Sequence, residues 1–198
     1  MSLGFHKGVS PLTIQLDQII RFLRELDGLL MMKRKIPLYL IGGGAITLAY
    51  DPENRTADLD LIDPPQDIIK KGGRDSRLSQ KYRLYISPLG EINFSVPCDW
   101  RAKCRPSTLA FQHLEIFIPC LEDIVLGKLA RLEPKDFEDI FALHEKKLLN
   151  PNKLLRRLRE NKKELKEITY RNNSRLLYKE IFQLQLIFEK RVPRTVKK

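Results

Sequence analysis

The sequence predicts an α+β fold, a small mixed β-sheet backed by helices and followed by a C-terminal helical extension. Apolar residues recur at helical spacing near the N-terminus and again from Leu121 onward. Between these regions lie short apolar runs, one of them strictly alternating, which is typical of strands. A length of 198 residues suits one domain with an extension. We therefore expect a core over residues 1–120 and a helical extension over 121–198.

The first half of the core is punctuated by proline and glycine. Leucine and isoleucine at helical spacing predict an amphipathic helix over 11–32, with Asp27 among the polar residues of its other faces. An apolar run predicts a buried strand over 38–41, and Gly42 ends it. A short helix is expected over 45–50, before Asp51-Pro52, because the residue before proline avoids helical geometry. Alternation then predicts a half-buried strand over 56–62.

The later elements are less sharply marked. A helix over 64–71 leads into a polar loop through Gly72 and Gly73. The remaining predicted elements are strands over 82–86, 91–96 and 114–118, and helices over 121–131, 135–147, 152–167 and 170–190. The apolar positions of the last helix are most simply core, but they equally fit an interface with a second copy or a partner protein. They are Leu176, Leu177, Ile181, Leu184, Ile187 and Phe188.

The net charge of +11 is concentrated at one end of the chain. Residues 151–198 hold 15 lysines and arginines against 5 acidic residues, while residues 1–150 hold 21 against 20. Such a tail attracts RNA or another polyanion, or it is simply a solvated basic face. Three cysteines without Cys-x-x-Cys spacing exclude a disulfide framework and a zinc knuckle. With no membrane-length apolar run and no secretory signal, we expect a cytoplasmic protein that does not enter membranes.

One segment carries chemistry. Glycines after a strand let backbone N–H groups approach a phosphate, and the N-terminus of the following helix adds positive potential. Asp58 and Asp60 project to the same face of their strand, while Leu59 and Leu61 bury the other. Paired carboxylates repel each other unless a cation lies between them, and oxygen ligands suit Mg²⁺ or Mn²⁺. A metal there can bridge triphosphate oxygens during an in-line displacement, so the pattern favours nucleotide transfer.

Two other phosphate-binding motifs compete for the glycines. Gly42-x-Gly44 opens a dinucleotide-binding fingerprint, and Asp60 and Asp63 lie near the spacing of its ribose-binding acid. However, Thr47 stands where the third small residue belongs, and Asp51-Pro52 leaves too short a crossover helix. A P-loop is excluded, because no Gly-Lys-[Ser/Thr] follows the glycines.

The order of strand, glycines, short helix and Asp-x-Asp strand resembles the signature of the polymerase-beta nucleotidyltransferase superfamily. The resemblance implies that Gly42 and Gly43 bind nucleotide, with Gly44 and Thr47 as further candidates, and that Asp58 and Asp60 bind metal. The superfamily usually adds a third carboxylate from a neighbouring strand. Asn93 occupies that position on the predicted strand over 91–96, and Glu91 or Asp99 are alternatives for orienting the acceptor.

A second block resembles the AbiEii-type toxin branch of that superfamily. It comprises residues 121–131 and the following Lys135-Asp136-Phe137-Glu138-Asp139. The resemblance implies that Lys128 contacts a nucleotide phosphate and that Asp136 lies near the active site, with Asp139 less certain. Local helix chemistry is the alternative, since acids suit a helix start and Lys135 is spaced to pair with Asp139.

Together these resemblances imply a metal-dependent nucleotidyltransferase that moves a nucleoside monophosphate from a nucleoside triphosphate to a hydroxyl of RNA, for instance tRNA, or of protein. They also imply a toxin–antitoxin role, with an antitoxin or a second copy on the C-terminal helices. The alternative is a catalytically impaired fold that binds nucleic acid or protein, since Asn93 is a poor ligand and not a base.

Overall fold

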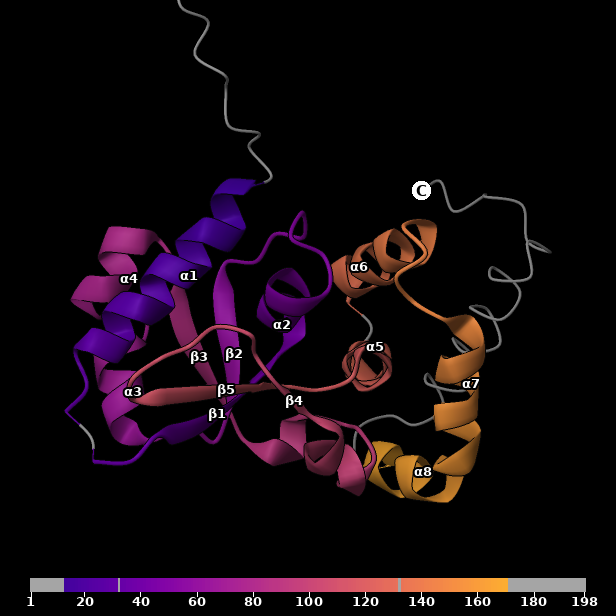
Figure 1. Ribbon diagram of the computed structural model, residues 1–198. Coiled ribbons are helices and arrows are strands. Elements are labelled where there is room, and N and C mark those ends of the chain that lie inside the picture. Colours follow the sequence, from indigo (N-terminus) through magenta and orange to yellow (C-terminus); the bar gives the residue numbers. More distant parts are fainter. Residues whose placement is uncertain (1–12, 32, 132, 171–198) are drawn as a thin grey trace, which may run out of the picture. The chain divides into compact units, whose positions relative to one another are not determined.

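The computed structural model describes residues 13–31, 33–131 and 133–170 (Figure 1). It confirms the α+β class, with a mixed sheet of strand order β3-β2-β1-β5-β4 accompanied by helices. The chain divides into two compact units. Of the described residues, the first unit comprises 13–31, 33–88 and 107–116, and the second comprises 89–106, 117–131 and 133–170. The segment 89–106 thus groups with the later helices, whereas the sequence analysis placed it in the core before residue 120.

The first unit contains the helix–strand alternation that the sequence predicts. Its elements are α1 (Thr13–Gly28), β1 (Ile36–Ile41), α2 (Gly42–Ala49), β2 (Asp58–Ile62), α3 (Gln66–Gly72), α4 (Arg77–Tyr82), β3 (Tyr85–Leu89) and the first part of β5 (Leu114–Ile118). Strands β1 and β2 run antiparallel, with Leu40 opposite Leu61 and Ile41 opposite Asp60. This register places the end of β1, and the glycines after it, beside the carboxylates of β2.

Helix α1 buries the apolar stripe that its sequence contains. Ile19, Phe22, Leu23 and Leu26 are almost fully buried, and α1 packs against α2, α3 and α4. Asp27 was expected among the polar residues of the other faces of the helix, but its side chain is buried as well.

The buried carboxylate of Asp27 fastens α1 to the start of β5. It accepts backbone N–H bonds from Gln112 at 2.8 Å, His113 at 2.8 Å and Leu114 at 2.9 Å. These three bonds account for the burial of a charged residue, since a buried carboxylate is costly unless it is hydrogen-bonded.

The second unit is largely helical. It contains the 3₁₀ turns η1 (Glu91–Asn93) and η2 (Cys98–Lys103), the short strand β4 (Arg105–Pro106), and the helices α5 (Leu121–Arg131), α6 (Pro134–Glu145), α7 (Pro151–Glu160) and α8 (Lys162–Tyr170). Within it, Trp100 is buried edge-on against Phe94, with ring centroids 5.2 Å apart. Gly127 lets α5 approach this cluster, because a Cβ there would stand 2.8 Å from the Phe94 ring.

The predicted strand over 91–96 is wrong. Residues 91–93 form η1, closed by bonds from Asn93 N–H to the Gly90 carbonyl and from Phe94 N–H to the Glu91 carbonyl, both 2.9 Å. Ile92 is 71% exposed while Phe94 is buried, although a strand would place both on one face. The indole N–H of Trp100 donates to Glu91 at 3.0 Å, an interaction that the local pattern does not reveal.

Other boundaries differ less. The strand expected over 82–86 begins at Tyr85, because α4, which was not predicted, runs to Tyr82 and Arg83 then turns with φ of 50°. The helix expected over 152–167 is interrupted at Asn161, which separates α7 from α8. The helix expected over 170–190 and its apolar residues lie outside the described residues. In the part of the chain that the structure describes, no helix is long and apolar enough to cross a membrane.

Candidate active site

Strand β2 presents two aspartates on one face. Asp58 and Asp60 are half-buried, and they alternate with the fully buried Leu59 and Leu61. The strand thus separates its carboxylates from the core as the sequence predicts. The two side chains of the predicted metal pair therefore share one face.

Gly42 lies directly against Asp60. A Cβ on Gly42 would stand 2.5 Å from Oδ2 of Asp60, and the residue has a φ of 64°, which favours glycine. Helix α2 begins at Gly42 itself, so the glycines form its first turn, ahead of the helix start predicted at residue 45. The first N–H groups of a helix lack intrahelical partners, and the apolar side chain of Ile41 at the N-cap cannot accept hydrogen bonds from them. An amide-rich helix start therefore faces the acidic strand.

The next two glycines allow α2 to pack on the strand. A Cβ on Gly43 would meet the Thr56 hydroxyl at 2.8 Å, and one on Gly44 would meet Leu59 Cδ2 at 2.8 Å. Gly44 is buried, whereas Gly43 is only half-buried. Close packing thus explains Gly44, and Gly42 and Gly43 remain the residues nearest to the surface.

Thr47, which the sequence analysis predicts to bind nucleotide, lies in the protein interior. Its side chain is 1% exposed, and its hydroxyl donates to the Gly43 carbonyl at 2.9 Å. The side-chain amide of Asn54 donates both to that hydroxyl, at 3.1 Å, and to the Gly43 carbonyl, at 3.0 Å. We therefore assign Thr47 a structural role in holding the first turn of α2.

The surroundings of Asp58 are compatible with a hard cation. The Tyr85 hydroxyl donates to Oδ2 over 3.4 Å, and the Thr56 hydroxyl lies 3.3 Å from Oδ1. Among the described residues, no group of three His, Cys, Asp or Glu side chains is arranged to hold a metal ion. Mg²⁺ commonly binds through one or two protein carboxylates together with substrate phosphates and water. The Asp58–Asp60 pair fits that donor set.

Asn93 belongs to the second unit and lies on η1, not on a strand. The other candidates for orienting an acceptor are already engaged within that unit. Glu91 accepts from Trp100 and pairs with Arg101, and Asp99 pairs with Arg157 and Lys103. The expectation of a third group on a neighbouring strand is therefore not met by any of these three residues.

The second unit joins Lys128, Asp136 and Asp139 in one buried cluster. The ammonium group of Lys128 lies 3.0 Å from Asp136 and 2.6 Å from Asp139, and the lysine side chain is 5% exposed. Arg131 forms a two-pronged contact with Asp136 at 3.0 Å and 2.8 Å. Burial would raise the pKa of Asp136, but hydrogen bonds from Arg131 and Lys128 outweigh it and lower this pKa. Lys128 thus forms ion pairs with two carboxylates, those of Asp136 and Asp139.

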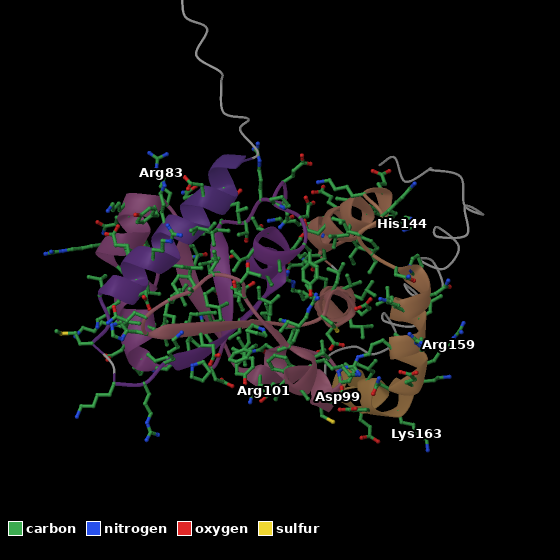
Figure 2. All side chains as sticks on the ribbon, viewed as in Figure 1. Arg83, Asp99, Arg101, His144, Arg159 and Lys163 are labelled. Atoms are coloured by element: carbon green, nitrogen blue, oxygen red, sulfur yellow. The ribbon has the colours of Figure 1, made fainter. Side chains whose placement is uncertain are left out.

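A further ion network, which joins the buried Arg157 and Asp123 to the exposed Asp99, had no signal in the sequence. Arg157 on α7 bonds to Asp123 at 2.8 Å and 3.0 Å and to Asp99 at 3.1 Å and 2.6 Å. Asp123 is fully buried, and Asp99 is labelled on the η2 turn in Figure 2. Only the tertiary structure brings η2, α5 and α7 together, so spacing along the chain does not reveal the network.

A glycine-led helix start packed against a strand with two aspartates is the arrangement of a nucleotidyltransferase fold. Comparison with known families agrees: the family model described as "Nucleotidyltransferase of unknown function (DUF6036)" matches residues 15–186. The chain belongs to this family. No curated protein and no solved structure matches it. The prediction of a nucleotidyltransferase is thereby confirmed, and membership indicates a nucleotidyl transfer function.

Proposed function

We propose that the protein is a metal-dependent enzyme that transfers a nucleoside monophosphate from a nucleoside triphosphate to a hydroxyl group. The observation that carries the proposal is the contact of the Asp60 carboxylate with Gly42, at the start of a helix that lacks a side-chain cap. It places acidic oxygen atoms next to backbone amides, the two kinds of group that a metal–triphosphate requires.

In the proposed reaction, an acceptor oxygen forms a bond to the α-phosphorus of the triphosphate. The bond between the α- and β-phosphates breaks, pyrophosphate leaves, and the acceptor hydroxyl loses its proton to water or a base. The amides of Gly42 and Gly43 bind phosphate oxygens, helped by the dipole of α2. Asp58 and Asp60 would hold Mg²⁺ or Mn²⁺, which supplies positive charge to the reacting phosphates.

The second unit supports a finer assignment to the AbiEii-type toxin branch. Its two motif segments form α5 and α6, and Lys128 joins Asp136 and Asp139 across them. With the ammonium group held by two carboxylates, we now propose that Lys128 positions these helices, in place of the expected phosphate contact. A toxin–antitoxin role, an RNA or protein acceptor and a cytoplasmic location remain part of this proposal.

The acceptor proposal favours RNA, because exposed basic side chains lie along α7 and α8. They are Lys153, Arg156, Arg159, Lys162 and Lys163. Figure 2 labels Arg159 and Lys163 on these helices. Phosphate contacts from such residues give salt-dependent binding.

The test is incubation with α-labelled nucleoside triphosphates, Mg²⁺ and total cellular RNA or total protein. We expect one fraction to become labelled, with pyrophosphate released in equal amount. Asp58→Asn and Asp60→Asn should each reduce labelling on the order of 100-fold or more, because catalysis here is mainly positioning and electrostatics. Asp63→Asn is the matched control: it removes an exposed carboxylate just after β2, at a φ of 43° that asparagine tolerates.

Full transfer by Asp58→Asn would refute the site. Binding of RNA or protein without any transfer, unchanged in Asp58→Asn and Asp60→Asn, would instead support the alternative of a catalytically impaired binding module.

A further inference from the structure

The glycine pair at the end of α3, Gly72 and Gly73, brings the chain onto strand β3. A Cβ on Gly72 would stand 2.6 Å from Ile86 Cδ1, and one on Gly73 would stand 2.5 Å from the Ile69 carbonyl oxygen. Gly73 also forms a parallel β-bridge with Ile86. The pair was expected to be a polar loop, yet both residues are buried. A side chain at Gly73 would meet backbone, whereas one at Gly72 would meet the end of the Ile86 side chain, so the close approach of the main chain favours glycine most strongly at Gly73.

Arg74 follows this bend and meets Tyr85, the residue before Ile86. Its guanidinium donates to the Tyr85 hydroxyl at 2.7 Å and also lies 4.7 Å from the centre of the tyrosine ring. The hydrogen bond to Tyr85 raises the pKa of Arg74. The Ser79 hydroxyl donates to the backbone carbonyl of Arg74, which fixes the main chain at this point. An exposed arginine is thus held at both its backbone and its side chain.

The Tyr85 hydroxyl links Arg74 to Asp58 through two hydrogen bonds. A phenol oxygen can accept one hydrogen bond and donate its own proton. Because Arg74 has only donors, the Tyr85 oxygen accepts from it, and its proton is left to point at Oδ2 of Asp58 over 3.4 Å. A cation bonded to the oxygen polarises the O–H group and strengthens the second bond of the chain. Hydrogen bonds of this kind often shorten when the ligand binds.

We propose that Tyr85 is a positioning residue for the metal-binding carboxylate of Asp58 and that Arg74 orients its hydroxyl. This inference rests on the proposed function, since it assigns an outer partner to one of its two metal ligands. Such partners fix the orientation of a ligating carboxylate, and their loss typically weakens metal binding by about 10- to 100-fold. Because both residues act through the Asp58 carboxylate in this proposal, the effect should appear first in metal affinity.

The experiment titrates the full chain with Mn²⁺ in the presence of a non-hydrolysable nucleoside triphosphate analogue, and it follows free Mn²⁺ by electron paramagnetic resonance. Tyr85→Phe should raise the dissociation constant by about 10-fold or more. Arg74→Met should act in the same direction, and Arg74→Lys should restore most of the affinity, because lysine still donates to the phenol oxygen.

Tyr82→Phe is the matched control. It deletes another tyrosine hydroxyl of the same unit that bonds a carboxylate, since Tyr82 donates to Glu25 at 2.7 Å. We expect its Mn²⁺ affinity to equal that of the wild type. Denaturation midpoints of all variants separate metal binding from stability.

Each outcome decides the matter. If the wild type binds Mn²⁺ and Tyr85→Phe binds it equally well, the inference fails while the proposed function stands. Equal losses in Tyr85→Phe and Tyr82→Phe would show a general structural effect and would also overturn the inference. A wild type that binds no Mn²⁺ overturns both the metal-dependent function and this extension of it.

Discussion

The Asp60 carboxylate lies so close to Gly42 that a methyl group there would stand 2.5 Å from Oδ2. This contact joins the strand that carries acids to the helix that offers amides. It depends on the antiparallel register of β1 and β2, in which Ile41 lies opposite Asp60. Changes at Gly42 should therefore disturb the carboxylate as well as the backbone.

Gly42→Ala should impair the site more than the fold. A φ of 64° costs an alanine about 1–2 kcal/mol, and the added methyl group forces the Asp60 carboxylate to move. We expect denaturation to show an unfolding free energy lower by that amount. We expect labelling to show a loss of nucleotide transfer larger than this loss of stability alone would cause. Gly28→Ala is the control, because nothing lies within 4 Å of its added Cβ, and it should change neither quantity appreciably. Unaltered transfer by Gly42→Ala would speak against the site.

Asp27→Asn should destabilise the first unit. Its carboxylate accepts three backbone N–H groups, and an amide would retain one acceptor oxygen while adding donors that face those groups. We expect a loss of about 3 kcal/mol in urea denaturation, because bonds to charged acceptors are strong and buried donors would be left unpaired. The comparison is Asp17→Asn, on the same helix but exposed and paired with the exposed Arg21. If Asp27→Asn and Asp17→Asn both had similarly small effects, the three bonds of Asp27 would not hold α1 to the start of β5.

Arg157→Met should strongly destabilise the second unit. It would leave the fully buried Asp123 without its partner, and breaking a buried ion pair costs about 3–5 kcal/mol. Arg156→Met removes an exposed neighbour with the same change of side chain, and it should shift the unfolding free energy by less than about 0.5 kcal/mol. If the two variants unfold at the same denaturant concentration, the network has little energetic importance.

Asp99 should make stability sensitive to acid. Hydrogen bonding from Arg157 lowers the pKa of Asp99 from 3.8 to about 2. Because the folded pKa lies below the unfolded one, its contribution is complete above about pH 4 and is lost as the pH falls toward 2. We expect the stability gap between wild type and Asp99→Asn to be largest near neutral pH and to shrink through this interval. A gap that stays constant in denaturation curves across it would exclude the linkage.

Periodicity and glycine chemistry predicted most elements of the first unit. The alternation of Asp58, Leu59 and Asp60 directly reports which side chains face the core. Other features depend on residues distant in sequence. The burial of Asp27 follows from amides near residue 113, and the sequence of α1 contains no trace of them. The strand predicted at Ile92 and Phe94 failed because the indole of Trp100 binds Glu91 and favours a 3₁₀ turn there.

Some features of the candidate site could also be predicted from the sequence, and others depend on residues distant along the chain. The resemblance to a family signature predicts Gly42 and Asp60 as site residues, but it does not reveal that the glycine also makes room for the carboxylate. Tyr85 and Arg74 could not be found from spacing, since their meeting depends on the bend at Gly73 and its bridge to Ile86. The burial of Thr47 could not be predicted either, because a hydroxyl near a glycine cluster has the same sequence pattern whether it faces a ligand or the protein interior.

The interleaved path of the chain has a consequence for protein synthesis. The amides that Asp27 accepts lie at residues 112–114, after the whole excursion through residues 89–106 has been made. During synthesis on the ribosome, the Asp27 carboxylate of α1 therefore cannot form its three hydrogen bonds until residues 112–114 have been made. A fragment that stops before residue 112 would retain the two aspartates of the site and yet leave this earlier acid without its amides.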